Sequence, residues 1–148
     1  MSATQEHIDA MKGRLRFGDA EECRALGYDP DDALQESFTE SCYNVTVLKE
    51  DVPIAMAGVR PHPSLLSNEG LPWCLTTEEV LEVPKTFMRL SKSVVHDLFA
   101  RKYNYLFNVV DARYNQAVRW LKWLGYTIDD AQPLGVNGEM FHLFWMRS

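Results

Sequence analysis

The feature that most constrains the fold is an apolar run, Tyr105–Val110, that lies between two amphipathic helical patterns. The run has the length of a strand and is typical of a central strand covered on both faces. The preceding helical pattern extends from Pro84 to about Lys102, and the following one covers Asn115–Leu124. Each places its apolar residues on one side, as a helix packed on a sheet requires. A last strand is expected at Met140–Met146, so this part predicts a strand–helix–strand crossover.

Before these helices, the sequence predicts a meander of three strands. Polar and apolar residues alternate over Tyr43–Leu48, and Ile54–Arg60 returns after a polar turn at Glu50-Asp51. Pro, Ser, Asn and Gly residues between 61 and 70 predict a loop, followed by a third strand at about Leu71–Thr76. A meander followed by a crossover predicts an α/β (α+β) fold with helices on both faces of a mixed, mostly antiparallel sheet.

The first 41 residues are expected to form short helices. Asp19 is a candidate N-cap for a helix that runs through Leu26, and Asp29-Pro30 begins another. No linker divides the 148 residues, of which 46% are hydrophobic, so we expect a single domain. It consists of a helical part, 1–41, and a part with the sheet and the long helices, 43–148.

Charge and composition exclude several classes of function. The net charge is −6; residues 1–82 carry 16 Asp/Glu and 6 Lys/Arg, whereas residues 83–148 carry 5 and 9. This distribution argues against nucleic-acid binding. No apolar stretch has the roughly 18 residues of a membrane span, and no signal sequence is apparent. Three cysteines without CxxC spacing indicate reduced thiols and a cytoplasmic protein, and the scattered histidines predict no metal site.

The segment from Val109 to Tyr126 resembles the GNAT acyltransferase pattern, in which a strand is followed by a helix that ends at Leu-Gly-Phe. Ala117, Leu124, Gly125 and Tyr126 occupy the matching places. The resemblance implies the GNAT fold and, in an active enzyme, an acetyl-CoA site between separated strands. It places these strands at 105–110 and 126–128.

A narrower resemblance is to GNAT-like proteins of tailed phages, including internal virion proteins of short-tailed phages. It is carried by four segments: Leu71–Thr76, Phe87–Val95, Ala112-Arg113 and Arg119–Gly125. It implies either a role in assembling or provisioning the phage particle or an acyltransferase activity. The protein would then be made in the host cytoplasm and could be packaged inside the virion.

The residues of an active GNAT site are only partly present. The family binds the cofactor pyrophosphate on a glycine-rich loop at a helix N-terminus, but the stretch Thr77–Lys85 has no glycine and contains three carboxylates. The position of the family's proton-donating Tyr is Leu121. Tyr114 and Tyr126 are weak catalytic candidates instead. The candidates for cofactor binding come from the two long helices: Lys85, Arg89, Asn115 and Arg119.

Trp120 and Trp123 are candidates for a protein-contact patch, because Trp beside Arg is a common binding anchor. The leading hypothesis is a GNAT-like phage protein with a degenerate active site. It would use no cofactor and would act in virion assembly through contacts with phage structural or assembly proteins. The alternatives are an acetyl-CoA-dependent N-acetyltransferase and an inhibitor of a host protein. The oligomeric state is left open.

Overall fold

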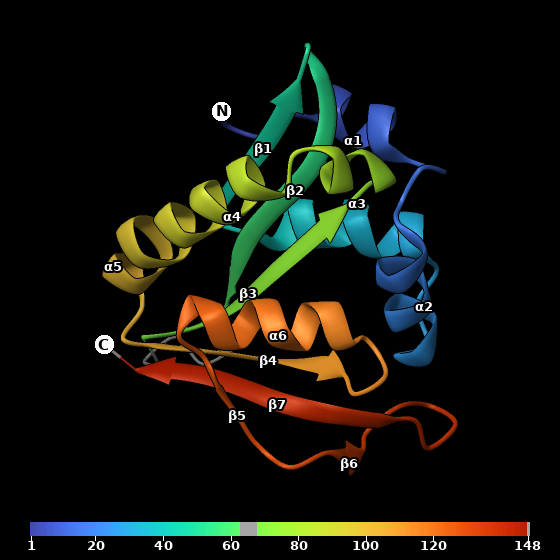
Figure 1. Ribbon diagram of the computed structural model, residues 1–148, viewed down its shortest axis with the longest axis vertical. Coiled ribbons are helices and arrows are strands. Elements are labelled where there is room, and N and C mark those ends of the chain that lie inside the picture. Colours follow the sequence, from blue (N-terminus) through green and yellow to red (C-terminus); the bar gives the residue numbers. More distant parts are fainter. Residues whose placement is uncertain (63–67, 148) are drawn as a thin grey trace.

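The structure is a computed structural model that describes residues 1–62 and 68–147 (Figure 1). Residues 63–67, the middle of the loop predicted between Pro61 and Gly70, lie outside the described residues. The helices are α1 (Gln5–Met11), α2 (Phe17–Ala25), α3 (Pro30–Glu40), η1 (Glu78–Glu82), α4 (Pro84–Ser93), η2 (Val94–Phe99), α5 (Ala100–Lys102) and α6 (Asn115–Leu124). The strands are β1 (Tyr43–Lys49), β2 (Val52–Pro61), β3 (Glu69–Thr76), β4 (Tyr105–Asp111), β5 (Thr127–Ile128), β6 (Gln132–Pro133) and β7 (Met140–Arg147).

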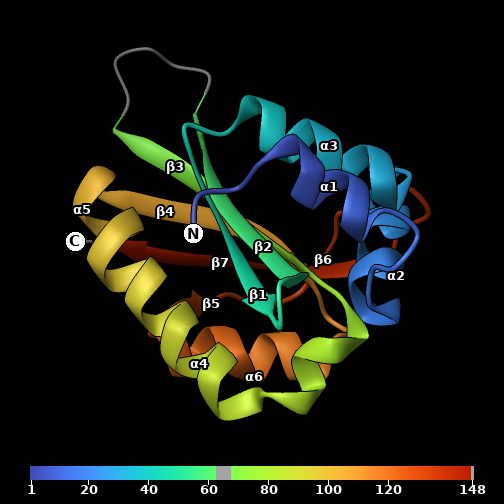
Figure 2. The same ribbon diagram turned by 90° about the horizontal axis from the view of Figure 1, so that it is seen from above.

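Within the described residues, the strands form one sheet in the order β1-β2-β3-β4-β7-β5, and β6 also pairs with β7. β3 and β4 pair in parallel, whereas the other pairs are antiparallel. Figure 2 shows α1 and α3 on one face of the sheet and α4 and α6 on the other. The predicted fold class is therefore confirmed: helices cover both faces of a mixed, mostly antiparallel sheet.

The turn between β1 and β2 is where the sequence predicted it. Glu50 and Asp51 have positive φ angles of 50° and 67°, which a two-residue turn between antiparallel strands requires because its twist must match that of the strands. Acidic Asp tolerates this conformation better than most residues do. The predicted helix Asn115–Leu124 is also confirmed, and Gly125 ends it with a φ angle of 107°.

The core has two parts, one on each face of the sheet. Under α6 and η2, the buried side chains include Phe99, Leu106 and Leu124. On the opposite face, Ile8 of α1 and Leu34 of α3 pack with a second group that includes Met56 of β2. By contrast, α4 has no buried residue although its sequence is strongly amphipathic.

Two sequence expectations about local structure were wrong, and a third, the helix from Pro84 to Lys102, was right in its bounds but not in its regularity. Asp19 does not cap a helix, because α2 begins at Phe17 and the Asp19 side chain lies in its first turn, buried. The helix predicted from Pro84 to Lys102 contains a π-helical segment, η2, between α4 and α5. The strands expected to separate, 105–110 and 126–128, are not neighbours, because β7 lies between β4 and β5.

None of the helices within residues 1–62 and 68–147 has the length and hydrophobicity of a membrane-spanning segment.

Candidate functional site

The strands that separate are β3 and β4. They pair only at Glu69 with Tyr105 and at Gly70 with Leu106, and from there they diverge (Figure 1). Close to this point, Asn108 Nδ2 donates a hydrogen bond of 2.9 Å to the carbonyl oxygen of Pro72. Beyond it, the facing edges of β3 and β4 no longer form a ladder, so their backbone groups must find other partners.

A cavity of about 1140 Å³ occupies this region. Its walls include residues of α2 and α3 as well as residues of α4 and α6, and these pairs of helices lie on different sides of the molecule (Figure 2). The apolar side of α4, with Phe87 and Leu90, faces this cavity, and none of its residues is buried. The space between the separated strands therefore connects the two faces of the sheet.

Helix α2 lies across the separated ends of the two strands. The carboxylate of Asp19 accepts hydrogen bonds from the backbone N–H and the hydroxyl of Thr76, the last residue of β3. The carboxylate of Glu22 accepts one of 3.0 Å from the backbone N–H of Asp111, the last residue of β4. Asp19 and Glu22 are three residues apart on α2, so they lie on one side of the helix. They satisfy N–H groups that the separation of the strands leaves without ladder partners.

Asp19 is buried, with 8% of its surface exposed. Burial raises the pKa of its carboxyl, although hydrogen bonds from Thr76 and Tyr114 and the positive charge of Arg16 lower it in part. The Tyr114 hydroxyl donates a hydrogen bond of 2.8 Å to Asp19 Oδ1. Burial also raises the pKa of this phenol, and so does the charge of Asp19. The pKa values of both groups therefore lie above their ordinary values.

Glu22 lacks a cationic partner in the described part of the chain. Desolvation raises its pKa to about 8, the hydrogen bond from Asp111 lowers it, and the nearby charges of Asp19 and Asp111 raise it further. The Asp111 carboxyl differs, because Arg113 donates hydrogen bonds of 2.7 and 3.0 Å to it. Burial alone would raise the pKa of Asp111, but these bonds hold it below its usual range. Glu22 is therefore a carboxyl group that titrates near neutral pH in a cavity wall.

Tyr114 is held in place from two sides. A Cβ atom at Gly18 would lie 2.6 Å from the Tyr114 ring, so only glycine allows this close approach of α2. On the same ring, the Arg16 guanidinium lies 5.6 Å from the centroid, and Arg16 also donates a hydrogen bond to Gln116 of α6. Tyr114, a catalytic candidate from the sequence, is thus fixed at the polar end of the cavity.

The other catalytic candidate, Tyr126, also lines the cavity but is packed in the core. Its ring makes an edge-to-face contact with Phe144, with 4.9 Å between the ring centroids. Burial raises the pKa of its phenol. Leu121, at the position of the family's Tyr, is buried in the same core.

The three carboxylates between β3 and α4 each have a partner elsewhere. Glu78 accepts a hydrogen bond from the backbone N–H of Phe17, and Glu79 forms an ion pair with Arg14. Hydrogen bonds from Thr77 and Arg14 lower the pKa of Glu79 to about 2. Glu82 forms an ion pair with Lys49. These contacts tie η1 to the N-terminal helices and to the β1–β2 hairpin.

The four candidates for cofactor binding do not line the cavity. Lys85 and Arg89 lie in a separate, shallow groove of about 710 Å³ along α4, η2 and α6. Asn115 and Arg119 are exposed on α6. The structure therefore brings Lys85 and Arg89 together and places them outside the space between β3 and β4.

The two tryptophans proposed as protein contacts have different surroundings. Trp120 is half-buried, stacks on Phe87 with 5.6 Å between the ring centroids, and donates a hydrogen bond of 3.0 Å to Ser91 Oγ. It thus links α6 to α4 at the wall of the cavity. Trp123 is 43% exposed, and Lys92 Nζ lies 5.0 Å from its ring centroid, in the shallow groove.

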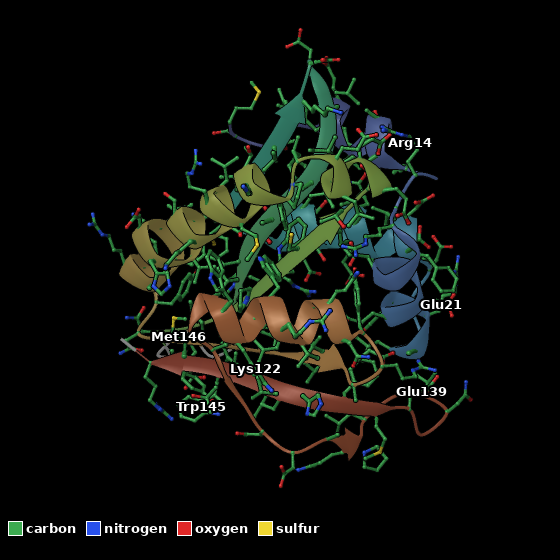
Figure 3. All side chains as sticks on the ribbon, in the orientation of Figure 1. Arg14, Glu21, Lys122, Glu139, Trp145 and Met146 are labelled. Atoms are coloured by element: carbon green, nitrogen blue, oxygen red, sulfur yellow. The ribbon has the colours of Figure 1, made fainter. Side chains whose placement is uncertain are left out.

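Sequence reasoning missed Asp19 and Glu22 as site residues. The signal was present in part: α2 has the sequence FGDAEECRA, in which Asp19, Glu22 and Cys23 share one side. A helix side with carboxylates and a buried Cys is unusual for a solvated surface. Glu21, which pairs with Arg24, lies instead on the outer side of α2 (Figure 3). Among the described residues, no group of His, Cys, Asp or Glu side chains has the arrangement of a metal site.

No protein-family model and no curated protein sequence matches the chain. Solved structures do match. The ribosomal-protein-alanine N-acetyltransferase of Brucella melitensis has a TM-score of 0.74 at 12% identity, over 100% of this chain and 98% of that one. An aminoglycoside 6'-acetyltransferase type Ii has a TM-score of 0.72 at 15% identity, over 99% and 95%.

A third match is a protein described as an acetyltransferase from Salmonella typhimurium, YncA, solved with its cofactor acetyl-CoA. Its TM-score is 0.70 at 12% identity, over 99% of this chain and 91% of that one. At such identities, the matches show the fold alone. The chain has the GNAT acetyltransferase fold.

Proposed function

We propose that the protein is an acyl-CoA-dependent N-acyltransferase. The observation that carries this proposal is the cavity between β3 and β4, which pair at two positions and then separate. An acyl-CoA thioester has a long, thin pantetheine arm, and a space between two strands, with apolar helices along it, suits such an arm. The matched structures support the proposal because their names describe acetyltransferases.

Two separate groups of residues fit the acyl-CoA molecule: one fits its pantetheine arm and the other its phosphates. The arm fits the space bounded by Leu75 of β3, Val109 of β4 and Ala117 of α6, all of which line the cavity. The stretch before α4 offers the phosphates no glycine-rich loop, because it has no glycine and η1 carries Glu78, Glu79 and Glu82. These carboxylates are engaged by other elements, and the cations Lys85 and Arg89 of α4 would hold the phosphates.

The reaction transfers the acyl group from sulfur to nitrogen. The lone pair of a neutral amine forms the new C–N bond, and the C–S bond breaks with its electron pair on sulfur. One proton lost by the nitrogen ends on the thiolate of CoA. Tyr114 would supply that proton and recover one from the amine, because its hydroxyl lies at the polar end of the cavity and its pKa is raised, which keeps it protonated.

Release of CoA from acetyl-CoA in the presence of primary amines tests this function. Ala117 is half-buried and lines the cavity, so Ala117→Trp should fill the space and abolish release while the protein stays folded. Lys122→Ala, on the same helix at an exposed position, is the matched control and should keep the wild-type rate. Equal rates for wild type and Ala117→Trp would contradict the proposal.

A role through protein contacts, as in assembly of a phage particle, is the second candidate. The observation in its favour is the exposed Trp123 beside Lys92. If this candidate is right, Trp123→Ala should lose a partner that Trp120→Phe retains, in pull-downs from phage structural proteins or from host lysate. CoA release by the purified protein, unchanged in Trp123→Ala, would instead favour the acyltransferase.

A further inference from the structure

We propose that Glu22 is the proton acceptor for the incoming amine, and that the acceptor substrate therefore arrives as a primary ammonium ion. This inference rests on the proposed acyl transfer. It names a residue on α2, outside the strand and helix segments that carried the sequence resemblance.

The Glu22 carboxylate is held at the end of β4 by one of its two oxygens. One carboxylate oxygen accepts the backbone N–H of Asp111 at 3.0 Å, which fixes the side chain at the end of β4. The other oxygen accepts no hydrogen bond from the described residues, and Glu22 lines the cavity. A carboxylate held by one oxygen can present the other to a substrate N–H group.

The charges around Glu22 leave it without compensation. Asp19 on α2 and Asp111 on β4 are the acidic groups that face it, and the Tyr114 phenol is close enough to feel its charge. The two nearby cations are engaged elsewhere: Arg113 binds Asp111, and Arg16 stacks over Tyr114 and binds Gln116. An ammonium ion in the cavity would supply the missing positive charge.

The proton affinity of Glu22 suits this task. An alkylammonium group has a pKa of about 10.4, so transfer to an ordinary carboxylate is unfavourable by roughly six units. The pKa of Glu22, raised to about 8 by desolvation, reduces that gap to about two units. A general base works best when its pKa lies near the working pH.

One proton leaves the substrate nitrogen before the C–N bond forms. The ammonium nitrogen gives one proton to Glu22 and becomes a neutral amine with a free lone pair. That lone pair forms the C–N bond with the thioester carbonyl carbon of the acyl-CoA named in the proposed function. Glu22 then returns its proton to solvent and regains its charge.

The surroundings on the α2 and α3 side also favour a cation. Glu36 of α3 lines the same cavity as Asp19 and Glu22. Glu40 lines it too, although it is paired with Arg60. Because α3 and α4 lie on opposite faces of the sheet (Figure 2), an amine could approach past α3 while the thioester lies on the α4 side.

The test uses Glu22→Gln with Glu21→Gln as its matched control, because Glu21 is the adjacent carboxylate and pairs with Arg24 on the outer side of α2. The first readout is a carbon NMR titration of protein labelled at the glutamate carboxyl carbons. A resonance that titrates near pH 8 should be present in wild type and Glu21→Gln and absent from Glu22→Gln. Addition of 1,5-diaminopentane, a primary diammonium probe, should lower that pKa.

The second readout is CoA release with acetyl-CoA and 1,5-diaminopentane. Glu22→Gln should lose about 100-fold in kcat/KM together with the ionisation near pH 8, whereas its calorimetric affinity for acetyl-CoA should stay at the wild-type value. A Glu22 resonance that titrates at pH 4 to 5, or that ignores the diamine, overturns the inference. If Glu22→Gln turns over at the rate of the wild type, the inference is overturned as well, whereas the proposed acyl transfer stands. Failure of wild type to bind acetyl-CoA overturns the proposed function, independently of the Glu22 titration.

Discussion

At the scale of single residues, Gly18 and Glu22 matter because they lie one helical turn apart on α2, at the polar end of the cavity. Gly18 allows the Tyr114 ring to approach the helix, and Glu22 binds the end of β4. The Glu22 side chain belongs to neither hydrophobic core cluster. Substitutions at Gly18 should therefore act on the packing and position of Tyr114, and substitutions at Glu22 on the protonation of the site.

Gly18→Ala should destabilise the protein by about 1 to 3 kcal/mol, because the added methyl group overpacks the site. Its Cβ would lie 2.6 Å from the Tyr114 ring. In an exposed helix the same change would be stabilising. Urea unfolding measures the effect. Tyr114→Ala should relieve the clash, so the double mutant should be more stable than the sum of the single changes predicts; simple additivity would show that ring and methyl do not meet.

The stability of the protein should depend on pH through Glu22. Its folded-state pKa, about 8, lies above the ordinary 4.5, so between these values the native state binds more protons than the unfolded state. The free energy of unfolding should fall as the pH rises through this interval, by up to about 1.4 kcal/mol per unit. Denaturant unfolding of wild type and Glu22→Gln across pH 5 to 8 measures it. A difference between the two that does not change with pH would contradict the raised pKa.

At the scale of elements, α4 and α6 form one wall of the cavity and are joined by Trp120. The ring stacks on Phe87, and the indole N–H binds Ser91. Because α4 has no buried residue of its own, this contact carries much of its attachment to α6.

Trp120→Ala should cost about 2 kcal/mol, less than a fully buried Trp would, because Trp120 is half-buried. Trp120→Phe keeps a ring for Phe87 and should lose only about 1 kcal/mol, the hydrogen bond to Ser91. Thermal or urea unfolding gives both values. If the two variants were equally destabilised, stacking on Phe87 would contribute nothing.

Most elements could be predicted from the sequence, because their periodicity and end signals are local. The run Tyr105–Val110, the Gly125 helix end and the Glu50-Asp51 turn are examples that the structure confirms. The π-helical segment η2 has the same apolar stripe as an α-helix, so no pattern distinguished it. The short strands β5 and β6 owe their pairing to β7, which no local signal reveals.

The site was harder to predict than the fold. Tyr114 could be selected from its place before the helix, but Asp19 read as a helix cap, and Glu22 gave no signal by itself. Their role depends on contacts with Thr76 and Asp111, which lie 57 and 89 residues away along the chain. Which strands separate also depends on the order of strands in the sheet, and that order placed β7 between β4 and β5.

At the scale of the whole molecule, the cavity crosses the sheet between two layers of helices. A ligand that binds the folded protein there stabilises it by mass action, by about 2.7 kcal/mol at 100 times its Kd. For a chain of 148 residues, that corresponds to a rise in Tm of roughly 5 to 10 °C. Differential scanning calorimetry with acetyl-CoA should show this rise for wild type, and Ala117→Trp should show none.

In the proposed function, the space between β3 and β4 holds the arm of an acyl-CoA. Calorimetric titration of the purified protein with acetyl-CoA, beside Ala117→Trp, tests it most directly. We expect saturable binding of one molecule per chain, with a Kd in the micromolar range, about −8 kcal/mol, and loss of binding in Ala117→Trp. Absence of heat with wild type at millimolar acetyl-CoA, or equal binding by both proteins, would contradict it.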